Sequence, residues 1–403
     1  MNKIIYFSGF SIYGLVSISV ILAAGLIYDV EEVGVLSVIV ALQYFISQFT
    51  GLGIHYSALF YDSKPNAKEM FSNHYLNVVI TSFVMSSCVY LLYNYFVSCS
   101  GMYRLIDYRT HMLLFGIMSS SNKVFINQLN AKKKFNWLGA IFGIKGVFVS
   151  LVLVCFFFNN LVLNDYIFFS FLVPEILVFI VYSFLGVYLF SEKTILSFKK
   201  YFINDLSFGL KSFWGALFLD TSTKLDVLLL GSFTNMTITG VYGLITVFSD
   251  IVIQYNVFIR SYFNPEITRV YYSKSISEFR FFLKSVIKKS YLFNAFFIIL
   301  NVGLLVFFIF NIPSLVNYSS GVIPLLILAL FFLLTSGCFV CFQLFGQIGL
   351  PLKQSYSFLI LFIANLVLNL ILIPFFGMIG AALATGISYL VFAIYTIYNI
   401  RVL

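Results

Sequence analysis

Long apolar stretches follow one another along almost the whole chain, with little polar sequence between them. Twelve of these stretches are long enough to cross a bilayer, which takes roughly 20 mostly apolar residues in helical form. Runs such as Leu225–Gly231 do not alternate between apolar and polar residues as the strands of a membrane β-barrel do. The pattern predicts helices over residues 4–28, 33–60, 75–97, 111–129, 138–158, 166–190, 207–233, 238–263, 287–310, 323–345, 355–376 and 378–400.

Composition supports the same class of protein. Hydrophobic residues make up 61% of the 403 residues and charged residues only 10%, whereas soluble domains carry about 25% charged residues. The first stretch is longer than the apolar segment of a signal peptide, so we interpret it as a membrane helix. We therefore expect an all-α polytopic membrane protein with twelve transmembrane helices.

The net charge of +9 is distributed unevenly between the two sides of the predicted membrane domain. Seventeen basic residues fall in alternate connections on the side of the N-terminus, and only Arg104 and Arg109 lie in loops on the other side. This positive-inside bias predicts that both termini are cytoplasmic. Basic loops that face anionic lipid also explain the net charge better than a nucleic-acid surface does. The seventeen residues are Lys3, Lys64, Lys68, Lys132, Lys133, Lys134, Lys193, Lys199, Lys200, Arg269, Lys274, Arg280, Lys284, Lys288, Lys289, Lys353 and Arg401.

The two halves of the chain resemble each other at an offset of 206 residues. Residues 32–37 (EVGVLS) resemble residues 238–243 (ITGVYG), and the same offset relates Gln48 to Gln254. We expect an N-terminal six-helix lobe over 1–190, a cytoplasmic linker over 191–206 and a C-terminal six-helix lobe over 207–403. An even number of helices in each half predicts two pseudo-symmetric lobes around a central cavity, an arrangement that transporters use for their substrate path.

Polar and small residues share one face of the span 33–60. Lipid cannot satisfy such groups, so we expect this face to line the cavity. The offset of 206 carries the same face onto the span 238–263, where it includes Asp250 and Gln254. The residues of the first face follow helical spacing and are Ser37, Ala41, Tyr44, Gln48, Gly51 and His55.

Nine charged residues remain inside the predicted spans, and each costs roughly 2.5–3.5 kcal/mol at the bilayer centre. So many charges imply a wet cavity or ion-pair partners. The basic residues outnumber the acidic ones, which suits an anionic ligand such as a phosphate or diphosphate. The candidates for substrate binding are Lys123, Lys145, Lys211, Lys224 and Arg260. The candidates for ion coupling or charge pairing are Glu175, Asp220, Asp226 and Asp250.

Several of these charges also have a structural interpretation. Lys211 and Arg260 lie within about two turns of the cytoplasmic boundary and can extend their charges toward it. Lys145 lies slightly deeper, and both interpretations stay open for it. Asp220 and Lys224 are i, i+4 neighbours and could form an ion pair within one helix.

Two further positions contrast with each other. Glu175 follows Pro174, which removes a helix hydrogen bond, so its carboxylate could serve only to repair the backbone. Lys123 lies in the middle of its span, and its own helix has no acidic residue to neutralise it. Lys123 is therefore the residue for which a functional role is hardest to dismiss.

Four short motifs resemble those of polysaccharide transport proteins. The span 7–8 signature of that family is similar to residues 225–231 (LDVLLLG) followed by 239–242 (TGVY), and residues 34–37 (GVLS) occupy the equivalent place in the first half. Residues 127–135 (NQLNAKKKF) resemble the family's span 4–5 junction, and residues 374–385 (PFFGMIGAALAT) its last-loop pattern. The resemblance extends over essentially the whole chain and is strongest to the Wzx-type O-antigen flippases of the multidrug/oligosaccharidyl-lipid/polysaccharide exporter superfamily.

This resemblance implies a transport function. The substrate would be an undecaprenyl-diphosphate-linked oligosaccharide unit, moved across the bacterial inner membrane by alternating access. Transport would draw on an ion gradient, which we favour, on a passive gradient or on a separate partner chain. The implied partners are membrane lipid and other O-antigen assembly proteins. We expect no nucleic acid, cofactor or metal, and the chain has no GxxxxGK[ST] loop for a nucleotide-driven engine.

Two other functions compete with this one. A multidrug exporter of the same superfamily would favour carboxylates over lysines in its cavity. An O-antigen polymerase or a lipid-linked glycosyltransferase would hold its catalytic residues in a sizeable external loop. The longest predicted external connection, 98–110, is short and the others are nearly uncharged, so we do not expect an enzyme.

Overall fold

The structure is a computed structural model that describes residues 2–62, 71–132, 134–158, 162–188 and 192–402. Within these ranges it consists of helices and turns, with no strand. The chain divides into two compact units, which we describe separately. Unit 1 comprises Met1–Ala23 and Ile39–Leu217, and unit 2 comprises Ala24–Val38 and Phe218–Leu403. Of the basic loop residues, Lys64, Lys68 and Lys133 lie outside the described residues.

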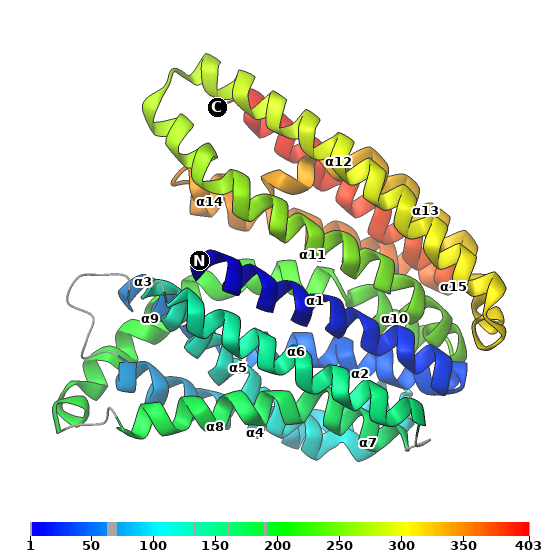
Figure 1. Ribbon diagram of the computed structural model, residues 1–403, viewed down its shortest axis with the longest axis horizontal. Helices are drawn as coiled ribbons and strands as arrows, with labels where there is room; N and C mark the ends of the chain where they lie inside the picture. The colour runs from blue at the N-terminus through cyan, green and yellow to red at the C-terminus, as the bar shows by residue number, and fades with distance from the viewer. Residues whose placement is uncertain (1, 63–70, 133, 159–161, 189–191, 403) are drawn as a thin grey trace. The chain divides into compact units, whose positions relative to one another are not determined.

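Unit 1 is built mainly from long helices that pack side by side (Figure 1). Helix α5 lies at its centre, since α3, α4, α6 and α8 all pack against it. The rings of Phe71, Phe125 and Tyr182 form part of its buried core. The helices that contribute to unit 1 are α1 (Asn2–Ile27), α2 (Val30–Phe49), α3 (Ile54–Asp62), α4 (Phe71–Cys99), α5 (Arg109–Ala131), α6 (Phe135–Phe158), α7 (Leu163–Ile167), α8 (Val173–Tyr188) and α9 (Glu192–Ser222), together with the short helices η2 (Tyr103–Tyr108) and η3 (Phe168–Leu172).

Unit 2 is organised around α15, against which α10 and α13 pack. A capping box between Ser275 and Glu278 begins α12 right after α11 ends, so these two helices form a hairpin. The remaining helices of unit 2 are α10 (Leu225–Phe233), α11 (Met236–Ser273), α12 (Ile276–Asn311), η4 (Pro313–Gly321), α13 (Val322–Thr335), η5 (Ser336–Cys341), α14 (Leu344–Gln347) and α15 (Pro351–Val402).

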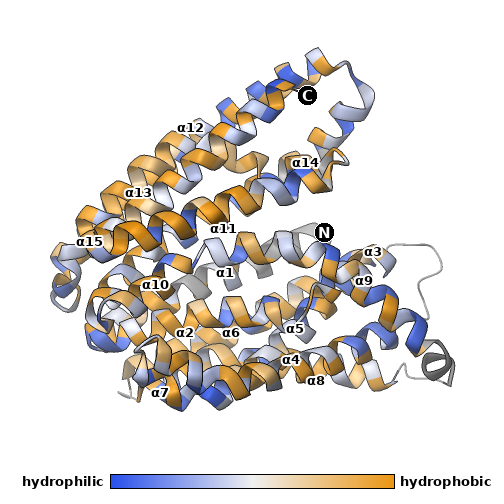
Figure 2. Ribbon diagram, turned by 180° about the vertical axis from the view of Figure 1, so that it is seen from behind, coloured by the Kyte–Doolittle hydropathy of each residue, from blue (hydrophilic) through white to orange (hydrophobic). Residues whose placement is uncertain are grey.

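Every predicted span coincides with a helix or a run of helices. Eight helical stretches of the described residues are long and apolar enough to cross a membrane, and one of them, Leu352–Val402, covers the last two predicted spans. Apolar residues dominate the middle of α12, α13 and α15, and polar residues gather toward the ends (Figure 2). The prediction of an all-α membrane protein is therefore confirmed.

Two predicted spans, 33–60 and 207–233, are interrupted, and a further turn, at Gly377, falls between the predicted spans 355–376 and 378–400. The span 33–60 turns at Leu52 (φ 43°) and Gly53 (φ 73°), and the final helical run turns at Gly377 (φ 54°). The span 207–233 is split between Ser222 and Leu225 into α9 and α10. The polar face predicted from Ser37 to His55 is consequently not continuous, because a turn changes the direction of the chain before His55.

The residues suggested as a linker, 191–206, are helical from Glu192 onward and form the first half of α9. This helix continues to Ser222, and the boundary between unit 1 and unit 2 falls within it, after Leu217. Helix α9 is thus a continuous connection from one unit to the other.

Positions related by the offset of 206 contact each other within unit 2. A Cβ added to Gly34 would lie 1.9 Å from the Met236 carbonyl oxygen, and one added to Gly240 would lie 1.9 Å from that of Val30. The contact is reciprocal, since Val30 and Met236 are related by the same offset. Two equivalent surfaces that meet in this way lie on a local two-fold axis. Glycine is required at both positions because the backbones of α2 and α11 approach too closely for any side chain.

We expect the substitution Gly240→Ala to destabilise the protein by roughly 1–3 kcal/mol, because the new methyl group would overlap backbone atoms that cannot move independently. The matched control is Gly303→Ala in α12, where a Cβ would meet nothing within 4 Å. This control should leave the protein equally or more stable, since alanine favours a helix over glycine. Thermal unfolding in detergent measures both variants. Equal midpoints would contradict the close packing of α2 against α11.

Candidate functional site

Lys123 lies in α5 of unit 1 and is half-buried. Its ammonium group donates a hydrogen bond of 2.9 Å to Ser47 Oγ on α2. Gln48 and His55 are buried, and Tyr44 is exposed over 43% of its surface. The backbone oxygen of His55 accepts a hydrogen bond from Asn127 Nδ2 of the same α5 helix. The first polar face therefore lies against α5, the helix that carries Lys123.

Lys145 forms a buried ion pair that sequence reasoning did not predict. Its Nζ atom lies 2.6 Å from Glu175 Oε1, and Asn122 Nδ2 donates to Glu175 Oε2 at 2.6 Å. Lys145 is 4% exposed and Glu175 is 8% exposed. Asn122 also donates to the Glu175 backbone oxygen, so a side chain of α5 binds the backbone directly after Pro174. The Glu175 carboxylate thus compensates the charge of Lys145 in addition to any backbone repair.

Lys224 lies in the break between α9 and α10, in unit 2. Its Nζ atom is 2.8 and 2.7 Å from the two carboxylate oxygens of Asp250 on α11. Since α9 ends at Ser222 and α10 begins at Leu225, Asp220 and Lys224 do not belong to one continuous helix. The break also leaves the Ser222 carbonyl oxygen without its helical partner, and Asn365 Nδ2 donates to it at 2.7 Å.

Asp226 connects two of the motifs that resemble polysaccharide transport proteins, the span 7–8 signature and the last-loop pattern. Its carboxylate accepts hydrogen bonds from Tyr242 Oη at 2.7 Å, from Thr385 Oγ1 at 3.0 Å and from the Val227 amide at 2.9 Å. Asp226 is buried in the first turn of α10. These bonds satisfy the buried carboxyl group within an apolar unit, which would otherwise be costly.

The other predicted residues are dispersed. The Arg260 guanidinium is buried and lies 5.3 Å from the centre of the Phe342 ring. Lys211 is exposed on α9, and Gln254 is half-buried on α11. Asp220 is half-buried near the end of α9, and its backbone oxygen accepts a bond from Thr223 Oγ1 at 2.7 Å.

A buried polar cluster in unit 1 was not predicted. Asp205 of α9 accepts hydrogen bonds from Ser57, His74 and Asn77, which come from α3 and α4. The sequence had suggested that Asp205 lies in a linker, residues 191–206. The one sign of this cluster in the sequence is that His74 and Asn77 lie three residues apart near the start of an apolar helix. This spacing does not indicate which residue they contact.

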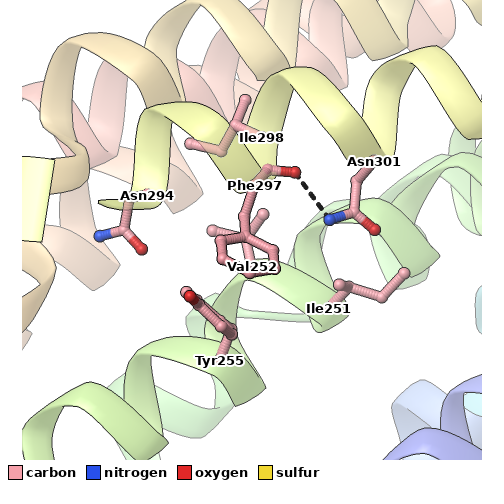
Figure 3. Close-up of a pocket in the computed structure, with 7 residues that line it drawn as sticks. All are labelled: Ile251, Val252, Tyr255, Asn294, Phe297, Ile298 and Asn301. Atoms are coloured by element: carbon pink, nitrogen blue, oxygen red, sulfur yellow. Dashed lines mark hydrogen bonds between the residues drawn. The ribbon is translucent and has the colours of Figure 1, made fainter. Parts of the chain in front are cut away.

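A small pocket lies in unit 2 between α11 and α12. It is lined by Ile251, Val252, Tyr255, Asn294, Phe297, Ile298 and Asn301 (Figure 3). Its cavity volume of about 20 Å³ is far below the range of roughly 300–1,000 Å³ that is typical of small-molecule sites. This pocket is too small for an oligosaccharide unit, and Asn301 donates its amide to the Phe297 backbone oxygen rather than toward a ligand.

Comparison with known proteins identifies the fold. Neither a protein-family model nor a curated protein matches the chain. Among solved structures, a multidrug resistance MATE family transporter of the MOP superfamily, in an inward-facing conformation, is 14% identical with a TM-score of 0.73, covering 99% of this chain and 97% of the other. The lipid II flippase MurJ, in an inward closed conformation, is 15% identical with a TM-score of 0.66, covering 99% and 87%. The MATE multidrug transporter DinF-BH is 16% identical with a TM-score of 0.65, covering 99% and 93%.

These likenesses show the twelve-helix fold of the MOP superfamily transporters, the multidrug/oligosaccharidyl-lipid/polysaccharide exporters. The similar proteins are transporters and flippases rather than enzymes.

The buried pair of Lys145 and Glu175 makes a testable prediction about stability. Lys145→Met should lower the free energy of unfolding by about 3–5 kcal/mol, because it leaves the Glu175 charge buried without its partner. The double substitution Lys145→Met with Glu175→Gln should recover a large part of this loss. Thermal unfolding in detergent is the measurement, and Lys200→Met, at an exposed lysine of α9, is the matched control. A double variant no more stable than the single one would argue against the pair.

Proposed function

We propose that this protein is a flippase that moves undecaprenyl-diphosphate-linked O-antigen oligosaccharide units across the bacterial inner membrane. The twelve-helix fold of MOP superfamily transporters supports a transport function, and it is shared with a flippase of lipid II. The seventeen-to-two distribution of basic loop residues supports cytoplasmic termini. The alternation between cytoplasmic and external access would then carry the substrate outward.

The observation that carries the proposal is the position of Lys123 in the middle of α5. Its side chain is half-buried, and its ammonium group donates a hydrogen bond to the Ser47 hydroxyl of α2. A diphosphate that crosses hydrocarbon loses its hydration at great cost. A fixed ammonium group inside the transport path replaces part of that hydration and attracts the phosphate oxygens.

The ion pairs narrow the set of residues that would bind the diphosphate. Lys145 and Lys224 each lie within 3 Å of a carboxylate, so their charges are largely compensated at rest. Arg260 rests on an aromatic ring, and Lys211 lies exposed near the cytoplasmic end of its span. We assign the main substrate contact to Lys123 because it lies in the middle of α5 and is only half-buried, with the other four basic residues contributing to the positive potential.

Export of cationic drugs is the second candidate function, because MATE multidrug transporters share this fold. Carboxylates such as Glu175 and Asp250 would then receive the drug. Both of these carboxylates already face a lysine ammonium group in their own unit, which favours an anionic over a cationic substrate. The two functions predict opposite results when Lys123 is removed.

Lys123→Ala should reduce the export of O-antigen units by about tenfold or more, the effect of losing one charged hydrogen bond. Lys123→Arg should retain part of the activity, since the positive charge persists. The assay measures surface polysaccharide in a strain that lacks its own copy of the gene, at equal protein levels in the membrane. Lys134→Ala, at an exposed lysine just beyond α5, is the control and should export normally.

Normal surface polysaccharide in the Lys123→Ala strain would overturn the proposed role of this residue. Unchanged polysaccharide together with altered efflux of ethidium, a cationic drug, would support the multidrug exporter instead. The same strain therefore distinguishes the two candidates.

Asp226 is the acidic residue that we propose for ion coupling. It is buried, and the hydroxyl oxygens of Tyr242 and Thr385 that now donate to it can also turn their lone pairs toward a cation. Asp226→Asn should abolish the dependence of transport on a sodium or proton gradient across membrane vesicles. Tyr242→Phe keeps the carboxylate and should retain that dependence. Transport by Asp226→Asn that still follows the gradient as in the wild type would exclude this role.

A further inference from the structure

The buried polar cluster of unit 1 is centred on Asp205 of α9, which is 0% exposed. One carboxylate oxygen accepts from Ser57 Oγ at 2.6 Å, and the other accepts from His74 Nδ1 at 2.8 Å and from Asn77 Nδ2 at 2.6 Å. This carboxylate therefore accepts from three donors on two other helices. The cluster is separate from Lys123 and from every residue that was assigned to substrate or ion binding above.

The hydrogen bond with Asp205 determines which nitrogen of His74 carries the hydrogen. An ionised carboxylate can only accept, so Nδ1 donates and Nε2 is the nitrogen that can bind a further proton. Nε2 lies 3.9 Å from Oδ1 of a second buried carboxylate, that of Asp62 at the end of α3. No hydrogen bond from the described residues reaches Nε2 or either carboxylate oxygen of Asp62. His74 is thus a basic group placed between two carboxylates, with its proton-accepting atom buried and unoccupied.

Among the described residues, the charged groups that act on Asp62 are His74, Lys132 and Asp205. Lys132 at the end of α5, Tyr182 of α8 and the amide of Gln128 face it, and Tyr75 of α4 lies against Tyr182. Asp62 lies beyond the predicted span 33–60. Burial raises the pKa of its carboxyl above the ordinary value, and the positive charges of His74 and Lys132 oppose that shift. The negative charge of the buried Asp62 carboxylate is therefore stabilised when a proton binds close to it.

We propose that His74 and Asp62 form a proton-binding site that Asp205 orients. The site takes up one proton on Nε2 of the neutral imidazole, and no other bond is made or broken. The product is an imidazolium that lies between the two carboxylates, with Asp62 on the Nε2 side and Asp205 on the Nδ1 side. Proton binding strengthens the hydrogen bond to Asp205, because a charged donor bonds a carboxylate more strongly than a neutral one does.

The same site holds the helix that joins the two units. Asp205 belongs to α9, which passes from unit 1 into unit 2 after Leu217. One turn further along, Gly209 lies against the turn at Gly53, where a Cβ would meet the Gly209 carbonyl oxygen at 2.3 Å. Helix α9 is therefore attached to α3 by a backbone contact and to α3 and α4 by the Asp205 cluster.

If the proposed transport function holds, the proton would act on transport through this attachment. A conformation in which α9 stays on α3 and α4 binds the proton more tightly than one in which it moves away. Linkage requires the reverse as well, so that proton binding favours the attached conformation and proton release favours its separation. The site would then couple a proton to the segment that connects unit 1 with unit 2.

Nuclear magnetic resonance of the imidazole nitrogens tests the site directly. The chain has only three histidines, His55, His74 and His111, so ¹⁵N-histidine labelling gives few signals, and the variant His74→Gln identifies that of His74. In the wild type, between pH 5 and 9, we expect Nε2 of His74 to change from unprotonated to protonated as the pH falls, while Nδ1 keeps its hydrogen.

Asp62→Asn removes the negative charge next to Nε2 and should lower the midpoint of this titration by about one pH unit or more. The matched control, Asp107→Asn at an exposed aspartate of η2, should leave the midpoint unchanged. A His74 signal that does not titrate in the wild type would overturn the proposal without needing any variant. An unchanged midpoint in Asp62→Asn would overturn it equally. The titration uses no substrate, so its failure would leave the flippase proposal standing, and the Lys123 result would not affect it.

Discussion

The requirement that buried polar groups find partners within the protein governs most of what is specific in this structure. Hydrocarbon offers no hydrogen bonds, so each charge and each interrupted helix in an apolar unit must be satisfied by another residue. Lys145 finds Glu175, Lys224 finds Asp250, and Asp226 finds the hydroxyls of Tyr242 and Thr385. These contacts join helices that are far apart in the sequence. These ion pairs and hydrogen bonds therefore specify which helices pack together, a choice that apolar packing alone would not determine.

The break between α9 and α10 shows how the same requirement permits an irregular backbone. A helix that stops inside an apolar unit leaves carbonyl oxygens without donors. Asn365 of α15 supplies one donor to Ser222, and Asn369 in turn donates to the Asn365 backbone oxygen. The break also releases Lys224 from the regular helix, which allows its side chain to reach Asp250 on α11. Discontinuous helices of this kind provide polar groups at positions where transporters bind their substrates and ions.

The close contact of Gly34 with the start of α11 explains why a short motif recurs in the two halves. Residues related by an internal repeat touch each other only where they lie on the local axis that relates them. Gly34 and Gly240 meet this condition, since each lacks room for a side chain against the backbone of the other helix. The glycine of the GV motif thus recurs in both halves because a side chain at either position would prevent the backbones of α2 and α11 from approaching this closely.

The amino-acid sequence by itself determined the membrane class, the approximate position of all twelve spans and the approximate two-fold repeat. These properties depend on local hydrophobicity and on residue spacing, which can be counted along the chain. It also located the buried charges, because a lysine or aspartate in an apolar run is conspicuous wherever its partner lies. Lys123 was recognised in this way, as was Asp226.

Only the tertiary structure decided which charges are paired and where the helices break. The partner of Lys145 is 30 residues away and that of Lys224 is 26 residues away on another helix, so no i, i+4 rule could identify them. The turn at Leu52 and Gly53 and the split after Ser222 fall inside predicted spans, because hydropathy averaged over about 20 residues is insensitive to such changes in backbone direction. His74, Asp62 and Asp205 come from three separate helices, and Asp205 lies in a stretch that is polar enough to resemble a linker. Their association depends on the packing of α9 against α3 and α4, and long-range packing of that kind leaves no periodic signal in a single sequence.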